Sequence, residues 1–180
     1  MDFSLRKAIP EDEAAIGQLI AASVRSLARG FYDEREIELS IRSVFGVDRE
    51  LIEDGTYFVA ADGGHDLVGC GGWSRRKTLY GASSYSASRD AAFLDPATDA
   101  AKIRAFFVHP NAARRGIGRA ILEACEAEAR SAGFRSAEMM ATLPGVPLYT
   151  ACGYQQGESV DIPIGEGQQI ECIRMFKELR

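Results

Sequence analysis

Residues 105–119 combine the residue types that binding of an anionic ligand requires. An apolar run at 105–108 ends at His109-Pro110, a turn follows, and the basic stretch 114–119 contains two glycines. Glycines let the backbone approach a ligand closely, and the free N–H groups in the first turn of a helix attract negative charge. This order of strand, glycine turn and helix start predicts a phosphate-binding site.

The local charge supports the same prediction. The chain has a formal net charge of −5 at pH 7, yet residues 100–122 contain five basic residues and no acidic one. A local reversal of sign of this kind indicates an anionic ligand. The five basic residues are Lys102, Arg104, Arg114, Arg115 and Arg119.

The patterns around this segment predict the elements that position it. Alternation and helical periodicity, bounded by glycine and proline, divide the chain into strands and helices. A strand–helix–strand unit requires a parallel, right-handed crossover, so the expected sheet is mixed, with antiparallel pairs at both ends. The expected strands are 3–9, 56–61, 67–73, 102–108, 135–141, 159–164 and 169–178, and the expected helices are 10–29, 33–45, 116–132 and 144–152.

Two of the expected helices have clear apolar faces, which predict the sides that pack against the sheet. In the first helix this face consists of Ile16, Leu19, Ile20, Val24 and Leu27, and in the helix at 116–132 it consists of Ile117, Ile121, Leu122, Cys125 and Ala129.

Residues 74–101 interrupt these patterns. Four of the six residues from 83 to 88 are serine, and the segment has no clear periodicity. A segment of this length without regular structure is usually functional or mobile. Two interpretations remain open: a lid over the substrate, or an ordered excursion that serves packing or dimer contacts.

Length and composition limit the class of protein. A chain of 180 residues is expected to form one domain over 1–180, and its 46% hydrophobic and 26% charged residues are ordinary for a globular protein. No apolar run is long enough for a membrane span, and the acidic N-terminal segment lacks the apolar core of a secretory signal. The acidic balance argues against nucleic-acid binding, and the two histidines and four scattered cysteines offer no metal site. We therefore expect a cytoplasmic protein without membrane, nucleic-acid or metal partners.

Two motifs resemble elements of the Gcn5-related N-acetyltransferase (GNAT) superfamily. Residues 114–119, Arg-Arg-Gly-Ile-Gly-Arg, resemble its acyl-CoA loop, (Gln/Arg)-x-x-Gly-x-(Gly/Ala). Residues 148–154, Leu-Tyr-Thr-Ala-Cys-Gly-Tyr, resemble its element (Leu/Phe)-Tyr-x-x-x-Gly-(Phe/Tyr). The resemblance covers nearly the whole chain. It implies an α/β (α+β) fold with a mixed central sheet, antiparallel at both ends, a parallel pair splayed at the centre and about four flanking helices.

The chain departs from the family pattern at three positions. Ala113 occupies the position of the leading Gln/Arg of the loop, and Thr142 stands where an asparagine is often found. The start of the central strand, residues 101–104, lacks the glutamate that serves some members as a base. The fold and the cofactor remain implied, whereas the general base stays unidentified.

The resemblance implies that acetyl-CoA, as a co-substrate, lies between the splayed strands. The backbone of Phe107 and Val108 would bond to the pantetheine arm and polarise the thioester carbonyl, and the glycine turn would hold the pyrophosphate. Thr142 would offer one hydroxyl hydrogen bond. The implied cofactor-binding residues are Phe107, Val108, Arg114, Arg115, Gly116, Ile117, Gly118, Arg119 and Thr142.

Tyr149 is the candidate catalytic acid, because a phenol stays protonated at neutral pH and can protonate, or donate a hydrogen bond to, a leaving thiolate. The alternative is that Tyr149 only packs the short helix onto the sheet. For the base, His109 fits a turn better than catalysis, Glu138 fits a solvated or salt-bridged carboxylate, and a water relay would leave no mark in the sequence.

For the acceptor, the resemblance points to the loop between the first two helices, with Arg29, Phe31 and Tyr32. The residues entering the irregular segment add Trp73, Arg75, Arg76 and Tyr80. The alternative places Trp73 in the core and Arg75 in solvent. The expected function is acetyl transfer from acetyl-CoA to a primary amine, most simply of a small molecule, by direct attack. A peptide or protein acceptor, or an acyl-CoA-binding module without turnover, remains open, and a homodimer is possible.

Overall fold

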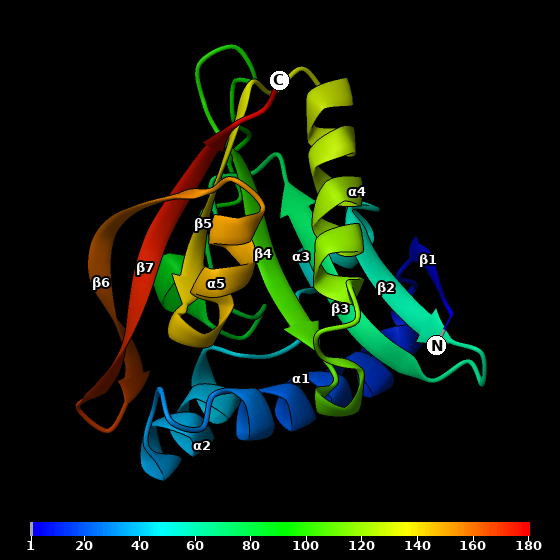
Figure 1. Cartoon of the computed structure of the whole chain (residues 1–180). Helices are drawn as coiled ribbons and strands as arrows, with labels where there is room; N and C mark the ends of the chain where they lie inside the picture. Colours follow the sequence, from blue (N-terminus) through cyan, green and yellow to red (C-terminus); the bar gives the residue numbers. More distant parts are fainter. Residues whose placement is uncertain (1) are drawn as a thin grey trace.

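A seven-stranded mixed sheet forms the centre of the computed structural model, which describes residues 2–180 (Figure 1). Its strand order is β1-β2-β3-β4-β5-β7-β6, and every neighbouring pair is antiparallel except β4 and β5, which are parallel. This arrangement confirms the predicted sheet. The strands are β1 (Phe3–Lys7), β2 (Tyr57–Asp62), β3 (Leu67–Ser74), β4 (Ala101–Val108), β5 (Ser136–Thr142), β6 (Gln155–Gly165) and β7 (Gln168–Glu178).

Five α-helices cover the two faces of the sheet. Helices α4 and α5 pack on one face, while α1, α2 and α3 pack on the other (Figure 1). The sequence predicted four of the five. The short α3 was missed, although Asp48 caps it by accepting a hydrogen bond from the Leu51 N–H at 3.4 Å. The helices are α1 (Glu13–Leu27), α2 (Glu34–Ser43), α3 (Arg49–Glu53), α4 (Ile117–Ser131) and α5 (Val146–Ala151).

The predicted apolar faces pack as expected, with one exception. All five residues of the α4 face are buried, and so are four of the five on the α1 face. The exception is Leu27 at the end of α1, whose side chain is 36% exposed. The expectation that Leu27 belongs to the core is therefore wrong, since its side chain borders a cavity.

The two central strands separate soon after they pair. Strands β4 and β5 are registered only at Ala101 with Ala137 and at Lys102 with Glu138. Beyond this point the edge of β4 that faces β5 has no strand paired with it, while β5 stays paired with β7 on its other edge. This confirms the predicted splayed pair.

A β-bulge in β4 sharpens the separation. Ala105 has φ +60°, a left-handed conformation that is rare for residues other than glycine, and the register with β3 shifts between Cys70 and Gly72. A Cβ at Gly71 would lie 2.7 Å from the Phe106 ring, so the neighbouring strand needs a glycine at this position. The Tyr57 hydroxyl donates to the Ala105 carbonyl at 3.2 Å and fixes the bulge.

Residues 74–101 form an ordered excursion. Backbone hydrogen bonds close its base, from the Leu94 N–H to the Arg75 carbonyl at 2.8 Å and from the Lys77 N–H to the Ala92 carbonyl at 2.9 Å. Its tip is fixed to the loop after α2, where the Ala82 N–H donates to the Val44 carbonyl at 2.9 Å. The segment therefore serves packing, the second of the two interpretations left open by the sequence.

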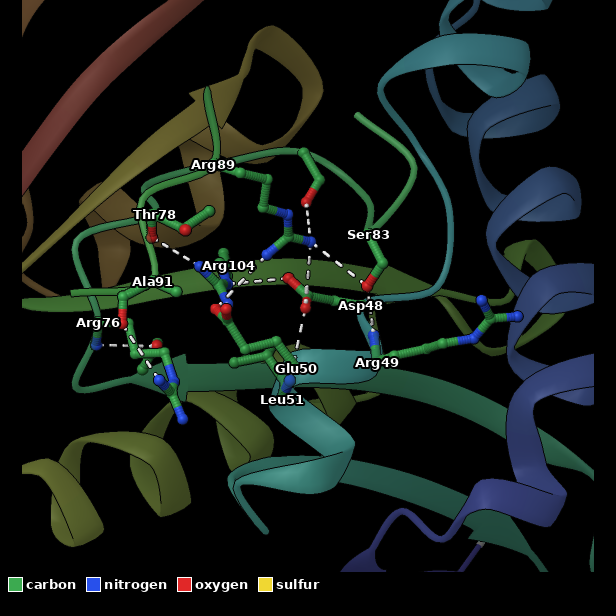
Figure 2. A network of polar contacts seen from close by, with 12 residues as sticks. Asp48, Arg49, Glu50, Leu51, Arg76, Thr78, Ser83, Arg89, Ala91 and Arg104 are labelled. Atoms are coloured by element: carbon green, nitrogen blue, oxygen red, sulfur yellow. Dashed lines mark hydrogen bonds and ion pairs between the residues drawn. The ribbon is translucent and has the colours of Figure 1, made fainter. Parts of the chain in front are cut away.

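A network of buried ion pairs ties this excursion to α3 and β4 (Figure 2). The Arg104 guanidinium lies 2.9 Å from Asp48 and 2.6 Å from Glu50, and it donates to the Thr78 carbonyl at 2.7 Å. Arg89 lies 3.3 Å from Asp48. Removing one member of such a buried network leaves an unpaired charge, which is strongly destabilising.

These contacts correct part of the charge argument made from the sequence. Arg104 belongs to the buried network, and Lys102 forms an ion pair with Glu138. Two of the five basic residues between positions 100 and 122 therefore do not face a ligand. Both lie on β4, whose alternation turns them into the protein, whereas the three arginines of the turn are exposed.

Candidate functional site

A cavity of about 710 Å³ opens where β4 leaves β5. The cavity is bounded by the turn before α4 and by α5, and also by the C-terminal half of α1 and the loop that follows it. The edge of β4 from Phe106 to Val108 completes its lining. The cavity thus passes through the splayed part of the sheet, and we call it the groove.

The turn before α4 borders the groove. Arg114 has φ +64° and Gly116 has φ +83°, and Gly116 caps the helix without a side-chain hydrogen bond. The first turn of α4 contains no acidic residue, so the N–H groups of its first three residues remain available to an anion. A Cβ at Gly118 would lie 2.8 Å from Leu148 Cδ2, so this glycine permits close packing of α4 against α5.

The edge of β4 presents backbone groups to the groove. The His109 N–H donates to the Val68 carbonyl at 2.9 Å, toward β3. Because successive amides of a strand point to opposite edges, the Val108 N–H points away from β3, into the groove. By the same alternation the Phe107 N–H points to β3, and Phe107 lines the groove with its ring. Of the two residues predicted to offer backbone bonds, Val108 has the suitable direction.

Tyr149 borders the groove from α5. Its ring makes edge-on contacts with Phe106 and Tyr154, both at 6.2 Å between centroids, and the residue is 8% exposed. Burial raises the pKa of the Tyr149 hydroxyl well above its ordinary value. This hydroxyl makes no hydrogen bond to another residue between positions 2 and 180. A Cβ at Gly145 would lie 2.9 Å from the Tyr149 ring, so the glycine leaves space for it.

Phe31 and Tyr32 line the groove from the loop after α1. Phe31 is 50% exposed, whereas Tyr32 is buried and its hydroxyl is fully engaged. That hydroxyl donates to the Glu171 carbonyl at 2.6 Å and accepts from the Leu143 N–H at 3.0 Å. Burial raises the pKa of Tyr32 well above its ordinary value. The ring of Tyr32 is available to a ligand, whereas its hydroxyl holds the loop after α1 against β7.

The structure separates the remaining acceptor candidates from the groove. Trp73 is 3% exposed, and its Nε1–H donates to Glu128 at 2.8 Å. Arg75 lies over the Trp73 ring at 5.9 Å. Neither lines the groove. The expectation that these two residues form an acceptor wall is therefore replaced by the alternative, in which Trp73 is part of the core.

The structure also places the other residues considered from the sequence. Thr142, Arg114 and Arg119 line the groove together with Gly116, Ile117 and Gly118, whereas Arg115 does not. His109 Nδ1 accepts from the Asn111 N–H at 3.2 Å, as expected for a turn.

Glu138 lies outside the groove and is salt-bridged. Burial alone would raise the pKa of Glu138, but hydrogen bonds from Lys102 and Arg174 outweigh it and lower that pKa below its ordinary value.

Sequence reasoning missed several residues that line the groove. The most prominent are Phe45, whose ring lies 5.8 Å from that of Phe107, and Phe106, which contacts Tyr149. The apolar run at 105–108 contains Phe106, but the bulge that turns it toward α5 has no sequence signal. Phe45 ends the expected helix 33–45, and nothing in that pattern indicates that its ring lines a cavity.

The charge of the lining is uneven. Among residues 2–180, the groove is lined by two arginines, Arg114 and Arg119, both at the turn, and by no aspartate, glutamate, lysine or histidine. The arrangement combines an anion site at the turn before α4, a backbone donor on β4, a phenol on α5 and an apolar lining from α1 and the loop that follows it. Among the same residues no cluster of possible metal ligands occurs, and no helix has the length and apolar character needed to cross a membrane.

Comparison with known proteins identifies relatives of the fold. The sequence model of the acetyltransferase (GNAT) family matches residues 21–154, about three quarters of the chain. A GCN5-related N-acetyltransferase structure from Rhodopseudomonas palustris has 20% identity and a TM-score of 0.72, with 99% of this chain and 97% of that chain covered. No curated protein sequence matches this chain.

Two further similar structures were solved with a ligand. The PaiA N-acetyltransferase of Thermoplasma acidophilum, in complex with coenzyme A, has 15% identity and a TM-score of 0.66 over 99% of both chains. The putative acetyltransferase YncA of Salmonella typhimurium, with acetyl-CoA, has 16% identity and a TM-score of 0.64 over 100% of this chain and 95% of that chain.

Proposed function

We propose that this chain, which belongs to the acetyltransferase (GNAT) family, transfers an acetyl group from acetyl-CoA to a primary amine of a small molecule. One observation carries the proposal: a single groove joins a turn suited to phosphate, an unpaired strand edge and a buried phenol. The complexes of two similar structures with coenzyme A and acetyl-CoA support the choice of co-substrate.

The residues of the groove fit acetyl-CoA. The first turn of α4, whose N–H groups no side chain caps, suits a pyrophosphate, because Gly116 has φ +83° and brings the backbone close. Arg114 and Arg119 add charge-assisted hydrogen bonds. The Val108 N–H suits a carbonyl oxygen, and Thr142 offers one hydroxyl. Acetyl-CoA supplies an acetyl group activated as a thioester.

In the proposed reaction the amine nitrogen bonds to the acetyl carbon and the carbon–sulfur bond breaks. The amine loses a proton, the sulfur leaves as a thiolate, and the products are an amide and a thiol. Tyr149 is placed to donate a hydrogen bond to the sulfur. Since burial raises the pKa of Tyr149 above that of a thiol, complete proton transfer would be uphill, and hydrogen-bond donation is the role that its environment favours.

The lining contains no side chain that acts as a base at neutral pH. Its only titratable groups between residues 2 and 180 are two arginines and two tyrosines. We therefore propose that the proton leaves the amine to water at the open end of the groove. The same feature favours the rival interpretation, an acyl-CoA-binding module without turnover, which differs in showing no thiol release.

The test is a steady-state assay of thiol release from acetyl-CoA with a panel of primary amines. An amine-dependent rate that saturates in both substrates, with an N-acetylated product in the mass spectrum, supports the proposal. Binding of acetyl-CoA without release for any small amine would favour the binding module, and release only with peptides would favour a peptide acetyltransferase.

A further inference from the structure

Part of the groove has an apolar lining, which we call the acceptor side. It is formed by Val24, Leu27 and Ala28 of α1, by Phe31 in the following loop, and by Phe45 and Phe107. Leu27 and Phe31 are 36% and 50% exposed, although large apolar side chains are normally buried. Apolar surface that is exposed beside a cavity marks a place where an apolar ligand binds.

Among residues 2–180 the lining offers a second charge on the acceptor no carboxylate and only two arginines, Arg114 and Arg119, which stand at the turn that we propose holds the pyrophosphate. Arg29, in the loop after α1, is exposed and does not line the groove. Arg76, another cation considered from the sequence, is paired with Asp54 at 2.7 Å and lies outside the groove. The Tyr32 hydroxyl is committed to the Glu171 carbonyl and the Leu143 N–H.

We propose that the acceptor is a monoamine whose amino group is attached to an alkyl or aryl body, with Leu27 and Phe31 as specificity-determining residues. Polyamines and amino acids are excluded, because each would place an unpaired charge against this lining. This inference rests on the proposed acetyltransferase function and names the substrate class of the same site.

The lining also affects the protonation of the acceptor. An apolar environment disfavours the charged form of an amine, so binding lowers the pKa of the ammonium group. A single proton of the bound ammonium group can then pass to water, which needs no carboxylate base, whereas a second ammonium would remain unpaired. The lack of a lining base and the preference for a monoamine thus have one physical cause.

The proposal is tested with a matched series of amines: butylamine, hexylamine, 1,6-diaminohexane and 6-aminohexanoate. Each buried methylene is expected to raise kcat/KM about fourfold, so hexylamine should exceed butylamine by about fifteenfold. The diamine and the amino acid have the same chain length as hexylamine but carry a second charge. Each should fall at least about tenfold below hexylamine.

Two variants test whether the apolar lining causes the preference for hexylamine. Phe31→Ala should lower kcat/KM for hexylamine about tenfold, because about half of the ring is available to the ligand, and should leave the KM for acetyl-CoA unchanged. Phe176→Ala is the matched control, since Phe176 is 47% exposed on β7 and does not line the groove. It should leave both values unchanged.

A higher kcat/KM for the diamine or the amino acid than for hexylamine, or equal effects of the two variants, would overturn the inference while leaving acetyl transfer intact. If no amine is acetylated, titration of hexylamine into the protein saturated with coenzyme A separates the two proposals. Binding that Phe31→Ala weakens would uphold the apolar acceptor site and reject the transferase, and no binding would overturn the inference as well.

Discussion

Replacing Tyr149 with phenylalanine removes one hydroxyl and little else. The ring contacts of Tyr149 with Phe106 and Tyr154, both at 6.2 Å, do not involve the hydroxyl. Since the hydroxyl makes no hydrogen bond to residues 2–180, its loss leaves no buried partner unpaired. The free energy of unfolding should therefore change by less than about 1 kcal/mol.

The effect on catalysis should be much larger. A hydrogen bond to a charged group contributes about 1.5–3 kcal/mol, which corresponds to about a 10- to 150-fold loss of kcat when the charge develops on the leaving sulfur. Binding of acetyl-CoA should change little, because the thioester sulfur carries no charge before the reaction. Tyr149→Phe should therefore lower kcat and leave the affinity for acetyl-CoA nearly unchanged.

The assay is amine-dependent thiol release for kcat, with calorimetric titration of acetyl-CoA for affinity and thermal unfolding for stability. The control is Tyr154→Phe, which removes a hydroxyl from a neighbouring buried tyrosine that does not line the groove. An unchanged kcat in Tyr149→Phe would refute the reasoning, and so would a loss of acetyl-CoA affinity as large as the loss of kcat.

Three further predictions concern the scaffold. Tyr32→Phe removes a hydroxyl that bonds two backbone groups and should destabilise the fold by about 1–3 kcal/mol, measured by urea unfolding. Arg104→Met leaves Asp48 buried without its nearest cation and should cost about 3–5 kcal/mol in the same assay; a loss below 1 kcal/mol would contradict the network. Glu138 has a lowered pKa, so its contribution is complete above about pH 4.5 and is lost as the pH falls through the folded-state pKa. The stability difference between wild type and Glu138→Gln should therefore narrow toward pH 3 in thermal unfolding.

The parts of the fold that the sequence predicted are those that local patterns determine. Helix periodicity placed the buried face of α4 correctly, and Gly116 marked the start of that helix because its φ of +83° suits glycine. The crossover between β4 and β5 follows from chain direction and handedness alone.

The features that the sequence analysis mispredicted or missed depend on contacts between residues far apart in the chain. Nothing near Arg104 in the sequence shows that Asp48 and Glu50 approach it from α3, so its charge was assigned to a ligand. The carbonyl of Ala105, which has a left-handed φ, accepts a hydrogen bond from the Tyr57 hydroxyl, 48 residues away in the chain. That bulge gives Phe106 its place in the groove, and a local pattern has no signal for it.

The acceptor side shows the same limit. Trp73 and Arg75 were placed beside the acceptor because an aromatic and a basic residue enter an irregular segment. The partner of the Trp73 indole is Glu128 on α4, and this pairing exists only in the folded protein. The prediction of Phe31 needed only the position of the loop after α1, and the family resemblance pointed to that loop.

The most direct test of the central claim is calorimetric titration of acetyl-CoA into wild type and into Gly116→Ala, with Gly167→Ala as control. Both glycines have positive φ and no atom within 4 Å of an added Cβ, so both variants carry the same backbone strain, about 1–2 kcal/mol. Only Gly116 belongs to the turn that we propose holds the pyrophosphate. The account predicts micromolar binding to wild type and Gly167→Ala, and binding at least about tenfold weaker to Gly116→Ala. No binding to wild type at millimolar acetyl-CoA, or equal affinity of the two variants, would contradict it.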